Sequence, residues 1–230
     1  MAGHMAIESA ARLTRLLHLA SPLLPVGAYS YSQGLEAAIA NGWVVDETSA
    51  GEWIVDVLAH VVGRVEAPIF LRLSCVAANR DGAGFAHWNE WFIASRETRE
   101  LRAETIQMGH ALAALAATLA PEVQALFAAC ERLSYPAGFA AFAAALGIPG
   151  EEALVAYLWA FAENQVAAAM KTVPLGQTAG QRLLVRLQQV CVDVCRSAAR
   201  IADDDIGSAG LAFALASCKH ETLYTRLFRS

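Results

Sequence analysis

The sequence predicts an all-α protein, folded as a single-domain helical bundle of about nine or ten helices. Three observations predict this fold class. Hydrophobic residues make up 56% of the chain, and much of that excess is alanine, the strongest intrinsic helix former. Apolar positions recur at helical spacing from end to end, and no run alternates long enough to predict a strand. No linker rich in Pro, Gly or Ser divides the 230 residues.

The first two helices are bounded by clear stop signals. We expect a helix over 7–20, which ends at Ser21-Pro22 because proline disfavours helical backbone in the residue before it. After a turn-rich stretch, a second helix is expected over 32–40. It ends at Asn41-Gly42, a sequence that favours the left-handed conformation of helix ends.

The next two helices have capping signals of their own. Asp46 is expected to cap a helix whose apolar positions include Trp53, Ile54, Val57, Leu58, Val61 and Val62. Pro68 can open the following helix, since proline suits the first helical turn. That helix is expected to end at the turn 79–82. Helical patterns then continue over the ranges 85–120, 121–133, 137–146, 151–172, 177–202 and 208–223.

Charge and apolar patterning exclude two classes of partner. The net charge is −5, and the lysines number only two, so no basic stripe exists for a phosphate backbone and no nucleic acid is expected. A long uncharged stretch, 133–150, contains two prolines and two internal glycines, whereas a membrane span needs about 20 predominantly apolar residues. Without a secretory signal either, the chain is expected to be cytoplasmic and away from membranes.

Two further expectations concern the start of the chain and its cysteines. Residues 1–4 resemble an expression-tag remnant, which leaves 5–230 as the folded domain. The five cysteines are odd in number and mostly far apart, which favours reduced thiols over a disulfide framework. Cys191 and Cys195 lie one helical turn apart, but apolar neighbours surround that face. We therefore interpret them as core residues and predict no metal site and no cofactor.

No catalytic constellation is found. Gly176 and Gly180 lack the Lys and Ser or Thr of a phosphate loop. His220-Glu221 begins like a zinc-protease motif, but Tyr224 occupies the position of the second histidine. The remaining histidines are isolated along the chain. No nucleophile and base are brought together by local spacing.

Three segments remain as candidate interaction sites. In 95–109, Arg96, Arg99 and Arg102 are expected along one flank of a helix and the glutamates along another, which is either solvated surface or a charged docking face. Lys171 ends an alanine-rich helix, where it either complements the helix dipole or reaches a partner. The segment 219–230 combines two arginines with Leu, Tyr and Phe, residue types that anchor interfaces, and we favour a docking tail over a packed terminal helix.

Five ordered segments resemble the hallmark motifs of the UreF family. They are SPLLPVGAYSYSQGLE (21–36), SRETRELRAE (95–104), KTVPLGQTAGQ (171–181), DIGSA (205–209) and KHETLYTRLFRS (219–230). The resemblance implies an all-α homodimer that binds UreD (also called UreH), recruits the GTPase UreG and acts on apo-urease during nickel delivery. It implies no catalytic activity of its own, although regulation of the UreG GTPase is possible.

The resemblance also assigns site residues. It implies that the UreG-facing residues are Lys171, Arg96, Glu97, Arg99 and Glu100. It implies that the tail facing UreD/UreH contributes His220, Glu221, Tyr224, Arg226, Leu227, Phe228 and Arg229.

Two other functions compete with this one. A small helical enzyme, thiaminase-like in size, would need a nucleophile and a base that the sequence does not reveal. A nickel-binding protein would use Cys191, Cys195 and histidines, but the apolar setting of the cysteines predicts little metal affinity. The adaptor is therefore the preferred hypothesis.

Overall fold

The computed structural model describes residues 2–208 and 210–230 and confirms the all-α fold class, with no strand in those ranges. The elements are α1 (Ala2–Ala20), η1 (Ala28–Ser30), α2 (Leu35–Ala40), α3 (Glu47–Asp56), η2 (Val57–Glu66), α4 (Ala67–Ala78), α5 (Gly82–Ala94), α6 (Arg99–Leu119), η3 (Pro121–Val123), α7 (Gln124–Ala128), α8 (Tyr135–Ala145), α9 (Gly150–Thr172), α10 (Gln177–Ala198), η4 (Asp203–Asp205) and α11 (Leu211–His220). No helix in these ranges is both long and apolar enough to span a membrane.

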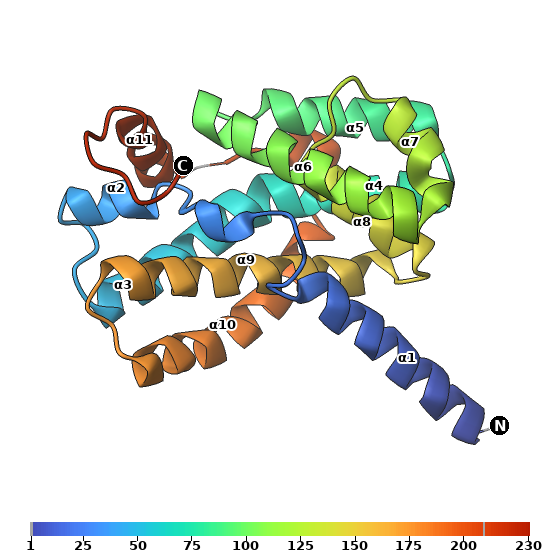
Figure 1. Ribbon diagram of the computed structural model, residues 1–230, viewed down its shortest axis with the longest axis horizontal. Coiled ribbons are helices and arrows are strands. Elements are labelled where there is room, and N and C mark those ends of the chain that lie inside the picture. The colour runs from blue at the N-terminus through green and yellow to red at the C-terminus, as the bar shows by residue number, and fades with distance from the viewer. Residues whose placement is uncertain (1, 209) are drawn as a thin grey trace.

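α1 extends away from the other helices (Figure 1). Its C-terminal part packs on α9, and Leu19 is fully buried there. Farther out, the helix leaves apolar side chains in solvent, among them Ile7 and Leu17, which are 71% and 62% exposed. The helix ends at Ala20, before Ser21-Pro22, as the sequence predicted.

α3, η2 and α4 form one continuous rod. Asp46 begins it with a capping box, in which its side chain accepts from Ser49 N at 2.8 Å. Pro68 lies in the first turn of α4, as the sequence predicted, but no break separates α4 from the helix before it. A π-helical segment, Val57–Glu66, joins α3 to α4, and Glu66 keeps right-handed helical dihedral angles. Pro68 is tolerated because it lies in the first turn after a change of helical register.

The predicted helix over 85–120 is two helices. α5 ends at Ala94, and Thr98 caps α6 by accepting from Leu101 N at 3.2 Å. A serine or threonine at a cap competes with helix continuation, and Thr98 within SRETRE is the local signal for this boundary. The range 121–133 contains only the short elements η3 and α7. The last helix ends at His220 rather than at 223.

The core lies where α4, α8 and α9 meet, with α6 packed on α8 and α10 on α9. Aromatic rings fill its centre, with Phe70 and Tyr157 5.0 Å apart and Phe139 packed edge-on against Tyr157. Cys191 and Cys195 are 1% and 6% exposed, which confirms them as core residues. Burial raises the pKa of the Cys191 thiol to about 12, so it stays protonated.

A second, smaller apolar cluster lies at the other end of α9. It joins α2, α3 and α11 to the end of α9 and includes Leu35, Val44, Ala169, Ala216 and Phe228. Gly34 precedes α2 with φ of 79°, and an added Cβ would lie 3.1 Å from Ser217 Oγ of α11. A glycine is therefore required where α2 meets α11, both for its backbone conformation and for the close approach.

Candidate functional site

Of the predicted docking segment 219–230, Lys219 and His220 belong to α11, and the tail is therefore Glu221–Ser230 from here on. The tail folds back beside α2 and α11 (Figure 1). Its backbone is held at two places. Arg229 N donates to Ser30 O at 2.8 Å, and Ser32 N donates to Ser230 O at 2.9 Å. The Ser32 hydroxyl donates to the same carbonyl at 2.6 Å. The tail is therefore attached to the turn that precedes α2.

Glu36 of α2 binds the tail through its backbone. Its Oε1 accepts from Leu227 N at 2.7 Å and its Oε2 from Phe228 N at 3.0 Å. Both oxygens of one carboxylate thus satisfy consecutive N–H groups, an arrangement that fixes the register of this stretch of the tail. Sequence reasoning did not single out Glu36, because its partners lie more than 190 residues away.

Glu100, in the first turn of α6, binds the tail through side chains. Its Oε1 accepts from Arg226 Nη1 at 2.5 Å, and its own N–H donates to Glu221 Oε1 at 3.2 Å. Arg226 is 39% exposed and Glu100 13% exposed, so the pair lies at the edge of the protein. Glu100 was assigned to the UreG-facing set and Arg226 to the tail, so the structure brings members of both sets into contact.

His220 lies under the tail with no exposed side-chain surface. Its Nδ1 is 2.6 Å from Glu100 Oε2, and its Nε2 is 3.2 Å from Glu36 Oε2. The same two carboxylates therefore contact both His220 and the tail. The histidine lies in the interior, beneath the surface that a partner could touch.

Side chains alternate between the two faces of the tail over its last four residues. Leu227 and Arg229 are exposed, whereas Phe228 and Ser230 are buried. The Ser230 hydroxyl donates to Glu104 Oε2 at 2.5 Å, and Gln33 Nε2 donates to Glu104 Oε1 at 2.6 Å. The exposed face of the tail consists of Thr222, Tyr224, Thr225, Arg226, Leu227 and Arg229.

Lys171 lies near the end of α9, beside the tail. Its ammonium is exposed and lies 5.7 Å from the centre of the Phe228 ring, within the range of a cation–π contact. Val173 N bonds Ala169 O, so the helix ends just after the lysine. Lys171 therefore occupies the dipole-favoured end of α9 and also touches the tail.

The expectation that Arg96 shares an exposed helix flank with Arg99 is wrong. Arg96 precedes α6, is 6% exposed and pairs with buried Glu66 at 3.4 Å. Glu100, four residues after Arg96, pairs instead with Arg226 of the tail. Glu97 and Arg99 are exposed, as expected for surface residues. The assignment of Arg96 to partner binding stays a prediction.

Two buried carboxyl groups form the interior side of this region. Glu66 bonds the Tyr157 hydroxyl, and burial raises its pKa. Burial also raises the pKa of Glu104 to about 7, against the opposing effect of bonds from Ser230 and Gln33. The sequence carried a signal for Glu104, because it lies three residues after Leu101 and four before Met108 on the buried face of α6.

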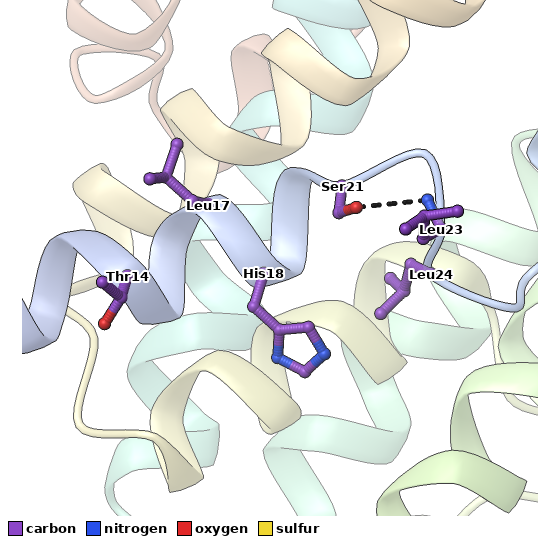
Figure 2. Close-up of a pocket in the computed structure, with 6 residues that line it drawn as sticks. All are labelled: Thr14, Leu17, His18, Ser21, Leu23 and Leu24. Carbon is purple, nitrogen blue, oxygen red and sulfur yellow. Dashed lines mark hydrogen bonds between the residues drawn. The ribbon is translucent and has the colours of Figure 1, made fainter.

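Two hollows lie at the base of α1. An open one of about 450 Å³ is lined by Thr14, Leu17, His18, Ser21, Leu23 and Leu24, with the side chains of Leu17 and His18 on different sides of the helix (Figure 2). A more apolar one of about 270 Å³ lies between α1 and α9. Neither gathers an acid, a base and a nucleophile. Within the described residues, no three His, Cys, Asp or Glu side chains are placed to hold a metal ion.

The chain is similar to proteins of one family along nearly its whole length. The sequence model of the family described as UreF matches residues 44–188. A relative from Janthinobacterium sp. (strain Marseille), named urease accessory protein UreF, is 48% identical over 221 residues, which cover 95% of this chain and 98% of the relative. A relative of the same name from Azoarcus sp. (strain BH72) is 50% identical over 223 residues, which cover 95% of each chain.

Proposed function

The chain belongs to the UreF family of urease accessory proteins, and from this premise we propose that it is an adaptor in urease assembly. In this proposal a cytoplasmic homodimer binds UreD/UreH through the tail and recruits the GTPase UreG to apo-urease, to which nickel is delivered. The protein is accessory rather than catalytic.

The observation that carries the proposal is the exposed face of the tail. Tyr224 is fully exposed and Leu227 is 64% exposed, although both are large and apolar enough to anchor an interface. The side chain of Arg226 is 39% exposed beside them and can make charge-assisted bonds. The buried side of the tail holds this face in place, so little ordering entropy opposes binding of a partner.

The contact between Glu100 and Arg226 supports a second part of the proposal. Residues assigned to UreG and residues assigned to UreD/UreH share this ion pair, and Lys171 contacts Phe228. A partner that moved the tail would therefore change the surroundings of Lys171 and of the first turn of α6. We propose that binding at the tail alters affinity for UreG through these contacts, a coupling that is reciprocal by thermodynamic necessity.

A charge introduced on the exposed face tests the proposal. In Leu227→Asp, the backbone N–H that bonds Glu36 remains, so the fold should be unchanged while capture of UreD/UreH is lost. Val185→Asp is the matched control, because Val185 of α10 is 65% exposed and α10 packs on α9, η2, α3 and α4 rather than on α11. If wild type and Leu227→Asp captured UreD/UreH equally and had equal melting temperatures, the tail would not be part of the interface.

A further inference from the structure

His220 is placed between two carboxyl groups that come from different helices. Its ring is completely buried, with Glu36 of α2 on the Nε2 side and Glu100 of α6 on the Nδ1 side. The distances, 3.2 Å and 2.6 Å, are both those of hydrogen bonds. The histidine belongs to α11, so this one ring joins three helices beneath the tail.

A neutral imidazole cannot satisfy both neighbours. It carries one N–H and one lone pair, so one nitrogen would face a carboxylate oxygen with no proton between them. An imidazolium donates from both nitrogens and supplies the positive charge that two poorly exposed carboxylates need. The geometry therefore requires one more proton than the neutral ring carries.

The surroundings favour that proton on the ring rather than on a carboxyl group. Both oxygens of Glu36 accept backbone N–H bonds from Leu227 and Phe228, and Glu100 accepts from Arg226. Hydrogen bonds donated to a carboxylate favour its ionised form. Glu221 accepts from the Glu100 N–H, which favours its ionised form as well. The imidazole is therefore the group of the cluster that takes the extra proton.

We propose that the imidazolium of His220 is a proton-dependent clamp that keeps the tail on the body of the protein. Glu36 and Glu100 contact the tail on one side and His220 on the other. When His220 loses its proton, the charge that holds these carboxylates together is lost and the tail is released. This inference concerns the chain alone and does not depend on the partners proposed above.

The charged groups around the ring set the direction of the effect. They are Glu36 from α2, Glu100 from α6, and Glu221 and Arg226 from the tail. Lys219 is directed elsewhere, to Asn41 Oδ1 at 2.6 Å and to the ring of Trp43. Deprotonation leaves three carboxylates against the single guanidinium of Arg226. The tail should therefore be attached at the lower pH and released as the pH rises.

The test measures the ring and the tail on the same full-length protein. Long-range ¹H–¹⁵N spectra report the protonation of His220, and the heteronuclear NOE of the Leu227 and Phe228 amides reports order in the tail. When both signals are followed over a pH series, they should change together. A neutral His220 beside a tail that remains ordered would overturn the proposal.

Two variants distinguish a proton-dependent role of His220 from a purely structural one. His220→Gln should give a mobile tail at every pH, but a buried substitution can also disturb α11. Glu100→Gln is the second variant, because its Oε1 can still accept from Arg226 while its amide donates to Nδ1 of a neutral ring, which removes the need for the extra proton. Both oxygens of Glu36 stay in place for the tail N–H groups. Tail order in Glu100→Gln should then no longer vary with pH. An unaltered pH midpoint in this variant would contradict the proposal.

His87→Gln is the matched control, because His87 is exposed on α5, in another part of the chain. It should keep the pH dependence of the wild type. If His87→Gln abolished the change as Glu100→Gln is expected to do, the transition would not belong to His220.

Discussion

The hydroxyl of Ser230 donates to Oε2 of Glu104 over 2.5 Å in the interior of the protein, although the two residues are 126 positions apart. Ser230 is 2% exposed and Glu104 is 4% exposed. The tail thus contacts a carboxyl group whose pKa is raised by burial. Stability and tail attachment are linked at this contact.

Glu104→Gln should raise the stability of the protein above neutral pH. Burial raises the pKa of Glu104 from 4.5 to about 7, so the folded state favours the protonated acid. A group with a raised pKa loses its contribution to folding as the pH rises, here between about 4.5 and about 7. Glutamine does not ionise, so the free energy of unfolding of Glu104→Gln should exceed that of the wild type by up to about 3 kcal/mol at high pH. Urea unfolding at a series of pH values measures this difference, and Glu97→Gln, at an exposed position, is the control. Parallel pH profiles for wild type and Glu104→Gln would contradict the prediction.

Phe228→Ala should lower the free energy of unfolding by about 2 to 4 kcal/mol. The ring is 6% exposed and packs in the second apolar cluster, so truncation leaves a cavity there. Leu227→Ala, one residue earlier and exposed, should cost under about 0.5 kcal/mol. Denaturant unfolding of both variants gives the comparison. Equal small losses would mean that the buried side of the tail contributes little to folding.

Lys171→Ala should leave the fold intact and reduce UreG-dependent activation of urease. The lysine is exposed, so its loss removes about 1 kcal/mol or less of dipole and cation–π stabilisation. Activation is measured with purified urease, accessory proteins and nickel. Arg200→Ala, which removes another exposed cation, is the control. If the Lys171→Ala variant activated urease normally, the prediction that Lys171 acts through UreG would be wrong.

Cys191→Ala should cost about 1 to 2 kcal/mol of stability and leave nickel binding unchanged. Because burial raises the thiol pKa to about 12, Cys191 should also resist alkylation in the folded protein. Exposed Cys75 and Cys218 provide the internal comparison, since they should react first. Mass spectrometry after timed alkylation gives the order. Rapid labelling of Cys191, or loss of tight nickel binding in the variant, would refute the core interpretation.

Many helix boundaries could be predicted from local signals such as prolines, glycines and capping residues. Pro22, Asn41-Gly42, Asp46 and Asp81 each lie at the helix boundary where the sequence predicted one. The failures share a physical cause. A cap such as Thr98 was hidden inside a run of good helix formers, and no local signal marks the π-helical register of 57–66.

The candidate site could be predicted only in part. The tail was identified from residue types, because Arg, Tyr, Leu and Phe together are unusual in solvated chain ends. Its attachment could not be predicted, since Glu36 and Glu104 meet the tail only after the chain has folded. Arg96 shows the converse, because a charge in a polar sequence context is buried once Glu66 lies beside it.

The alternation of side chains along the tail has a consequence for protein engineering. Phe228 and Ser230 fasten the segment, whereas Tyr224 and Leu227 project outward. If the tail binds a partner as proposed, partner preference and thermal stability depend on different residues of one ten-residue stretch. A library that randomises Tyr224 and Leu227 while keeping Phe228 and Ser230 should yield folded proteins with altered binding, without a compensating change elsewhere in the chain.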